Sequence, residues 1–316
     1  MDQLRAMRVF ARVIDEGSFA GAARALDLAP AVVTRLIAEL EGHLSTRLLN
    51  RTTRRLALTD VGEAYLERAR RILAEVDEAE ELATDSTKEA RGHLRVLLPP
   101  TFAVHQMAKR LLSFHQQYPQ VTLELHSHGP VVDVDEAFDI TIVTSKEAPE
   151  GEYVARRLAR SEVILCAAPE YLQAHGRPKH PRDLPAHEFL LPEASPFVGG
   201  LTLCRGSEAI NMPRPSGRPL LSAPVEANYA AALHGLGIAG LPSFMLEDAL
   251  LEGVLERVLP EWQMFSFTLW AALPSRKYMP ARTRVFLDFL LASFGGEDVD
   301  PWLAAAGCAT PRFSVG

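Results

Sequence analysis

The chain has 316 residues, of which 47% are hydrophobic and 23% charged, so it can form the cores of two or three water-soluble domains. No apolar run approaches the roughly 18 residues of a membrane span, and we expect no membrane partner. Its three cysteines lie far apart and its first residues carry no secretory signal, which excludes a disulfide framework and predicts a cytoplasmic protein without metal or cofactor.

The charge is unevenly distributed along the chain. The formal net charge is −7, yet residues 1–59 contain nine arginines against six acidic residues. A basic head on an acidic body suits a nucleic-acid-binding module joined to another domain. A solvated surface has the same composition, so charge alone does not decide between them.

Three helices are predicted in the first 43 residues. Apolar residues recur at helical spacing over 4–14, and Gly17 ends that helix. Ser18 is placed to cap a helix from Phe19 to Leu26. Pro30 fits the first position of a third helix that runs to about His43, because its missing N–H is not needed there.

The second and third helices have the arrangement of a helix-turn-helix. In that geometry the second helix of the pair enters the major groove of DNA. Thr34 and Arg35 lie on the outward face of the third predicted helix and are suited to base edges and phosphates. Spacing alone leaves a plain three-helix bundle with a solvated arginine as an equal alternative.

A basic segment follows the third helix. Arginines cluster in RLLNRTTRRLALT, Thr52-Thr53 is turn-like, and Leu56 and Leu58 alternate as in a short strand. The pattern predicts a two-stranded wing whose Arg and Thr side chains reach phosphates or the minor groove.

A long helix is predicted from a cap at Thr59 to about Lys88. Its apolar residues recur every three or four positions, and charged residues cover its other faces. This narrow stripe favours pairing with a second copy of the chain, as in a coiled coil. One core helix of the following domain is the alternative. The stripe consists of Val61, Tyr65, Ala69, Ile72, Val76, Ala79 and Ala83.

The first 66 residues resemble the LysR-type transcriptional regulators. The resemblance rests on SFAGAARALDL, VVTRLIAELEGHL and RLLNRTTRRLALTDVGEAYL. It implies an all-α winged helix-turn-helix followed by a linker helix that pairs two subunits. The resemblance assigns DNA contact to Ser18, the cap of the second helix, and to Pro30, Thr34, Arg35, Arg51, Thr53 and Arg54.

Three positions depart from the pattern of that family. Ala29 stands where a capping Ser is usual, Ser45 where Gly is common, and Leu49 where Phe is common. None removes a basic contact, but Ala29 deprives the third helix of a capping hydroxyl and is expected to alter half-site preference.

From Gly92 onward, strands alternate with helices, which predicts a mostly parallel sheet. Strands are expected in HLRVLLPP, VTLELHS and DITIVTS, with helices at Thr101–Tyr118 and Val131–Phe138. A second lobe follows with strands in EVILCAAP, LTLCRG, GRPLLS and FSFTLWAAL, and with helices in PEYLQAHG and PVEANYAAALHG. A helix over Ala281–Phe294 closes the fold, and the tail from Gly295 to Gly316 is expected to be poorly ordered.

The resemblance extends over this body through GHLRV, PEYLQAHG, DLPAH, GLGIAGLP and RVFLDFL. It implies a two-lobed α/β effector-binding domain shaped like a type 2 periplasmic binding protein. The expected domains are 1–59 for the winged helix-turn-helix, 60–90 for the linker helix and 91–294 for the effector domain. Lobe I spans about 91–160 and 268–294, lobe II about 161–267, and 295–316 form a flexible tail.

Candidate effector contacts lie where strands end or helices begin at the expected cleft. Each of them is also explained by capping or packing. Ala223-Pro224 stands where the family has Asp or Asn, which removes one expected polar contact. The candidates are Thr101, Phe102, His128, Thr144, Phe197 and Ser222.

The predicted function is therefore a sequence-specific, effector-modulated transcription factor, either activator or repressor. Its expected partners are double-stranded promoter DNA, a small-molecule effector, further copies of itself as dimer and tetramer, and RNA polymerase. An enzyme is disfavoured because no HExxH, GxSxG or phosphate-loop pattern occurs. His126 and His128 alternate on one strand, but no further ligand is spaced to complete a metal site. A solute-binding protein whose head serves only for assembly remains the other class.

Overall fold

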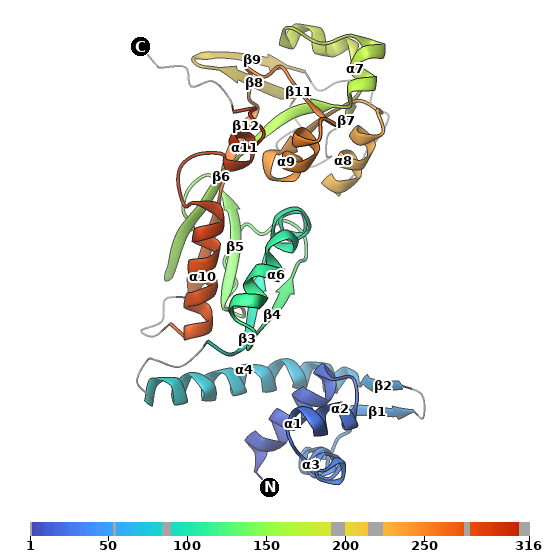
Figure 1. Ribbon diagram of the computed structural model, residues 1–316, viewed down its shortest axis with the longest axis vertical. Helices are drawn as coiled ribbons and strands as arrows, with labels where there is room; N and C mark the ends of the chain where they lie inside the picture. The colour runs from blue at the N-terminus through green and yellow to red at the C-terminus, as the bar shows by residue number, and fades with distance from the viewer. Residues whose placement is uncertain are drawn as a thin grey trace. The chain divides into compact units, whose positions relative to one another are not determined.

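The computed structural model describes residues 2–52, 55–83, 90–190, 200–213, 224–274 and 279–309 (Figure 1). The chain forms two compact units, Met1–Lys88 and Glu89–Gly316, which we call the head and the body. Among the described helices, none is both long and apolar enough to cross a membrane.

The head contains the predicted helices and wing. Gly17 ends the first helix with φ of 63°, and the Ser18 hydroxyl caps the second by accepting a hydrogen bond from the Gly21 N–H at 3.0 Å. The third helix begins at Pro30, as predicted. Its elements are α1 (Gln3–Asp15), α2 (Phe19–Ala25), α3 (Pro30–His43), β1 (Leu49–Thr52), β2 (Arg55–Leu58) and α4 (Asp60–Ala83).

One apolar core holds the head helices together. Phe10 of α1 and Ile37 of α3 are fully buried, and the small side chains of Ala22 and Ala23 let α2 approach its neighbours closely. Helix α4 contributes three buried residues to the same core: Leu66, Ala69 and Leu73.

The apolar stripe predicted for α4 is thus divided. Ala69 is fully buried in the head core, whereas Val61 and Ile72 remain 53% and 43% exposed. The alternative that α4 is a core helix of the following domain is wrong, because its buried face packs on the head. The predicted end near Lys88 falls outside the described residues.

The body is built on one eight-stranded sheet in the order β4-β3-β5-β12-β6-β10-β7, with β11 paired to β6. The strands β3 to β5 are parallel, but β12 runs antiparallel to both β5 and β6. The expected parallel pairing is confirmed for β3, β4 and β5, but the whole sheet is mixed because β12 and β6 pass through the body in opposite directions. The strands are β3 (Gly92–Leu97), β4 (Val121–His126), β5 (Ile140–Ser145), β6 (Tyr153–Ala167), β7 (Phe189–Leu190), β10 (Ile238–Pro242), β11 (Glu256–Val258) and β12 (Phe265–Pro274).

Separate groups of core side chains divide the body into two halves. In the first half, one face of β3, β5 and β12 packs against α6 and α10. In the second half, β6 and β10 are covered by α8 and α9 on one side and by α7 and the β8–β9 hairpin on the other. The helices and the hairpin are α5 (Pro100–Phe102), a π-turn (Ala103–Met107), α6 (Ala108–Gln117), α7 (Pro169–His175), a 3₁₀ turn (Pro181–Ala186), β8 (Leu201–Arg205), β9 (Glu208–Met212), α8 (Val225–Leu233), α9 (Ser243–Leu251), α10 (Ala281–Phe294) and α11 (Pro301–Ala305).

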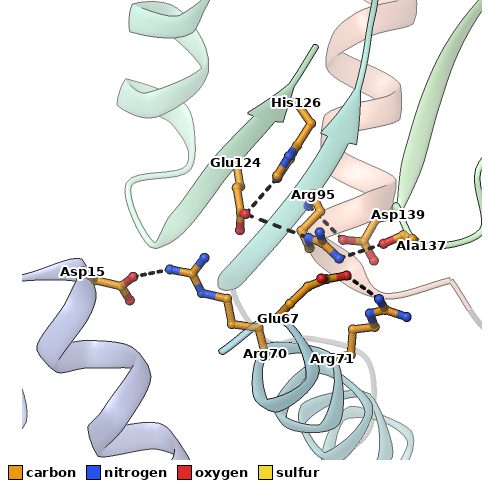
Figure 2. Close-up of polar contacts among 9 residues, drawn as sticks. All are labelled: Asp15, Glu67, Arg70, Arg71, Arg95, Glu124, His126, Ala137 and Asp139. Atoms are coloured by element: carbon orange, nitrogen blue, oxygen red, sulfur yellow. Dashed lines mark hydrogen bonds and ion pairs between the residues drawn. The ribbon is translucent and has the colours of Figure 1, made fainter. Parts of the chain in front are cut away.

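The helix expected over Val131–Phe138 is absent, and that prediction was wrong. Asp135 turns the chain instead, because its carboxylate accepts the Ala137 N–H at 2.8 Å. The side chain of Arg95 on β3 then holds this turn by donating to the Ala137 carbonyl at 2.9 Å (Figure 2). A local bond from Asp135 and a long-range bond from Arg95 thus replace the expected helix.

The tail was also predicted incorrectly in part. Helix α11 begins at a cap from Asp300, and its Trp302 and Leu303 are 1% and 0% exposed in the body core. Residues 310–316 of the tail and the strand expected in GRPLLS lie outside the described residues.

Candidate DNA-binding surface and ligand pocket

The outward face of α3 is the first candidate surface. Pro30, Thr34 and Arg35 are all exposed, and the Arg35 side chain is 69% exposed. The Thr34 hydroxyl donates to the Pro30 carbonyl at 3.0 Å, and the Arg35 Nε lies 3.6 Å from a Glu39 carboxylate oxygen. Such exposed i,i+4 pairs are weak, so both side chains can be redirected to a ligand at little cost.

The start of α3 carries no side-chain cap. Ala29 occupies the N-cap position and makes no side-chain hydrogen bond, as its sequence departure predicted. In this first turn Pro30 has no N–H, and the Val32 N–H donates to the Ala29 carbonyl at 2.9 Å, so it is the helix dipole that favours an anion beside Pro30. Ser18, by contrast, uses its hydroxyl to cap α2.

A single carboxylate fixes the base of the wing. One oxygen of Glu41 accepts hydrogen bonds from the N–H groups of Leu48 and Leu49, at 2.9 and 3.1 Å. Thr59 lies between β2 and α4, where its hydroxyl donates to the Arg47 carbonyl at 2.8 Å and accepts from the Gly62 N–H at 2.9 Å. Helix α3, the wing and α4 are therefore linked through side-chain hydrogen bonds to backbone groups.

The wing itself is an antiparallel pair in which Arg51 lies opposite Leu56. Arg51 thus sits near the end of β1, although its side chain is not among those described. The other two wing candidates, Thr53 and Arg54, lie outside the described residues. The assignments of all three therefore stay predictions.

An ion pair holds α1 against α4. Arg70 donates to the Asp15 carboxylate at 2.6 Å, and the two side chains are only 22% and 20% exposed (Figure 2). The contact joins α4, which carries the exposed Val61 and Ile72, to α1 of the head. Helix α4 is therefore held to α1 by this ion pair as well as by the shared apolar core.

In the body, four of the six expected effector contacts lie among the described residues. Thr101 is partly buried in α5, and His128 is exposed after β4. Thr144 ends β5, where its hydroxyl lies 3.4 Å from the Val131 carbonyl. Phe102 has no exposed surface and packs on Phe244 and Phe294, which indicates a core role. The last two candidates, Phe197 and Ser222, lie outside the described residues.

A pocket of about 540 Å³ lies on β6 and β12 instead. It contains three basic side chains that sequence reasoning did not select: Lys146, Arg157 and Arg160. The run ARRLAR on β6 was a signal for Arg157 and Arg160, because three arginines within six residues of one strand are unusual. The remaining lining residues are Cys204, Gln263, Met264, Phe265, Ser266, Phe267, Thr268 and Asp298.

No cluster of metal ligands occurs among the described residues. His126 lies 2.8 Å from Glu124 on the same strand (Figure 2). Exposed His128 follows that strand, and no third His, Cys, Asp or Glu is grouped with this pair among the described residues.

Each of the two units matches a family of known proteins. The model of the bacterial regulatory helix-turn-helix protein, lysR family, matches residues 4–63, and that of the LysR substrate binding domain matches residues 87–295. The HTH-type transcriptional regulator YhjC of Escherichia coli (strain K12) is 34% identical over 92% of this chain and 97% of its own length. CrgA of Neisseria meningitidis serogroup C is 33% identical over 92% and 97%.

Solved structures give the same result. CrgA, titled a LysR-type transcriptional regulator, matches with a TM-score of 0.57 and 32% identity over 92% of this chain and 98% of that chain. The full-length virulence activator AphB of Vibrio cholerae matches with a TM-score of 0.56 and 26% identity over 92% and 99%. By its two family domains and its full-length relatives, the chain belongs to the LysR-type transcriptional regulators.

Proposed function

We propose that this regulator binds double-stranded promoter DNA with α3 in the major groove and the β1–β2 wing on the neighbouring backbone. The observation that carries the proposal is the free outer face of α3, where Thr34 and Arg35 are exposed one turn after Pro30. Thr34 and Arg35 contact base edges, whereas Arg51, Thr53 and Arg54 contact phosphates. The uncapped first turn of α3 adds a phosphate site beside Pro30.

Two heads act together in this proposal. Val61 and Ile72 leave an apolar stripe on α4 that the head core does not cover, and a second α4 buries it in a homodimer. Two heads then read a partly palindromic site, and pairs of dimers form a tetramer. The protein works in the cytoplasm with RNA polymerase as its further partner.

A small-molecule effector regulates the protein by binding in the body. The ligand shifts the balance between two arrangements of the body's halves only if it binds one of them more tightly. An enzyme or a free solute-binding protein is a weaker reading, since neither explains an exposed recognition helix and a wing on the same head.

The test is a mobility-shift titration of the full chain on DNA selected from a random-sequence library. We expect Arg51→Ala and Arg54→Ala to weaken binding to every sequence and to reduce the slope of log K against log salt by about one each. Arg284→Ala, an exposed arginine on α10, is the matched control. Unchanged affinity and slope in both wing variants would show that the wing does not contact DNA.

A further inference from the structure

The pocket on β6 and β12 occupies the place where the two halves of the body are joined. These two strands are shared by both halves, and β12 pairs with β5 through Thr268–Ala272 and with β6 along its whole length. Lys146 directly follows β5 in the first half, while Cys204 and Met264 belong to the second. A ligand here touches both halves at once.

Strand register places the basic side chains on one face. Arg160 lies opposite Thr268, and a register shift between Leu269 and Trp270 brings Arg157, three residues away on β6, opposite Trp270, two residues further along β12. Directly opposed residues point to the same side of a sheet, as do residues two apart on one strand. Both guanidinium groups therefore share the face that carries the Thr268 hydroxyl.

The charge on this face is not balanced. Arg157 is satisfied, since it lies 3.4 Å from the Asp298 carboxylate and 5.3 Å over the Trp270 ring. In the described part of the chain, neither Arg160 nor Lys146 has a carboxylate partner, and the Arg160 Nε is buried without a hydrogen-bond acceptor. A buried donor without an acceptor is costly, so a ligand that supplies an acceptor would be favoured here.

We propose that this pocket binds a small, polar organic anion through Arg160 and Lys146, with Thr268 as an additional hydrogen-bond donor. The planar guanidinium of Arg160 suits the paired oxygens of a carboxylate or phosphate. This proposal rests on the proposed function, because the anion is the effector class of the regulator. Its negative charge offsets the two free cations and draws the two halves together.

Cys204 provides a local reporter, since it lines the pocket and is partly exposed. Cys166 is fully buried, and burial raises the pKa of its thiol, so it reacts slowly. Replacing Cys308 by Ser leaves Cys204 as the reactive thiol of the described residues. The rate of alkylation of full-length Cys308→Ser protein then measures occupation of the pocket.

The probes are succinate, citrate and inorganic phosphate, with succinamide as the neutral counterpart of succinate. We expect at least one anion to slow alkylation of Cys204 while succinamide does not. Arg160→Gln and Lys146→Gln should each raise the anion concentration needed for half protection by about 10- to 100-fold. Arg284→Gln should leave it unchanged, and unchanged tryptophan fluorescence shows that each variant is folded.

The anion that protects distinguishes a carboxylate from a phosphate ligand, and protection by either supports the proposal. Protection by no anion, equal protection by succinamide, or full protection in Arg160→Gln and Lys146→Gln would overturn it. Lys146 is exposed, so its variant tests the charge even where Arg160→Gln fails to fold. DNA binding, measured separately, shows whether the proposed function stands when the anion site does not.

Discussion

Glu41 offers a sharp test of how the head positions its wing. Its carboxylate accepts hydrogen bonds from two consecutive N–H groups, those of Leu48 and Leu49, whose residues have no exposed surface. Replacing Glu41 by Ala leaves both donors buried without an acceptor. A hydrogen bond to a charged group contributes about 1.5–3 kcal/mol, and partial access of water reduces the total loss to about 2–4 kcal/mol.

The assay is hydrogen exchange of the segment 44–58 in the full chain, read by mass spectrometry. All three tryptophans lie in the body, so fluorescence would not report on the head. We expect exchange in Glu41→Ala to be about 30-fold faster or more, and DNA affinity to fall about 10-fold because the displaced wing loses its backbone contacts. Glu41→Gln, which keeps one acceptor oxygen, should show an intermediate effect.

Glu39→Ala is the matched control, since Glu39 lies on the same helix and pairs with exposed Arg35 alone among the described side chains. Its effect on exchange should correspond to less than about 0.5 kcal/mol. If exchange and DNA affinity in Glu41→Ala equal those of the wild type, the carboxylate does not hold the wing, and the reasoning is wrong.

Three further predictions follow from single positions. Ala29→Ser should add the missing side-chain cap of α3 and slow exchange in its first turn by the equivalent of about 1 kcal/mol; no slowing would mean that the Ala29 carbonyl, which accepts from the Val32 N–H at 2.9 Å, already satisfies this turn. Gly62→Ala should disrupt the head and abolish DNA binding, because its Cβ would lie 2.0 Å from the Leu48 carbonyl oxygen; normal binding would contradict the close approach. The His105 ring packs 5.1 Å from the Tyr229 ring, and burial lowers its pKa below the ordinary value near 6.5. The contribution of neutral His105 to stability is therefore present above pH 6.5 and is lost as the pH falls through the lowered pKa. The free energy of unfolding of the body, measured with denaturant and tryptophan fluorescence from pH 7.5 to 5.5, should therefore fall more in wild type than in His105→Gln. Equal dependence of this free energy on pH in the two proteins would refute the assignment.

Much of the head could be predicted because its signals are local. Gly17 and Pro30 mark helix boundaries by their own backbone preferences, and the structure confirms both. Ser45 follows the same logic, since its φ of 51° explains why Gly is common at that position. Ala69 was misplaced because a helical stripe alone does not show which of two partners covers each residue.

The body was less predictable because its decisive contacts are long-range. Arg95 and Ala137 are far apart in sequence, yet their hydrogen bond replaces the helix expected there. Trp302 packs in the core although its Gly- and Ala-rich surroundings suggested a disordered tail. The pocket was missed for the same reason, since Lys146 and Arg160 come together only through the pairing of β5, β12 and β6.

The central claim is that α3 reads DNA sequence, and one ratio tests it most directly. The affinity of the full chain for its library-selected site, divided by that for a scrambled duplex at the same salt concentration, measures specificity independently of phosphate contacts. For Thr34→Ala and Arg35→Ala, we predict that this ratio falls about 5- to 100-fold, with Arg284→Ala unchanged. A ratio that stays at the wild-type value in both variants would contradict the account.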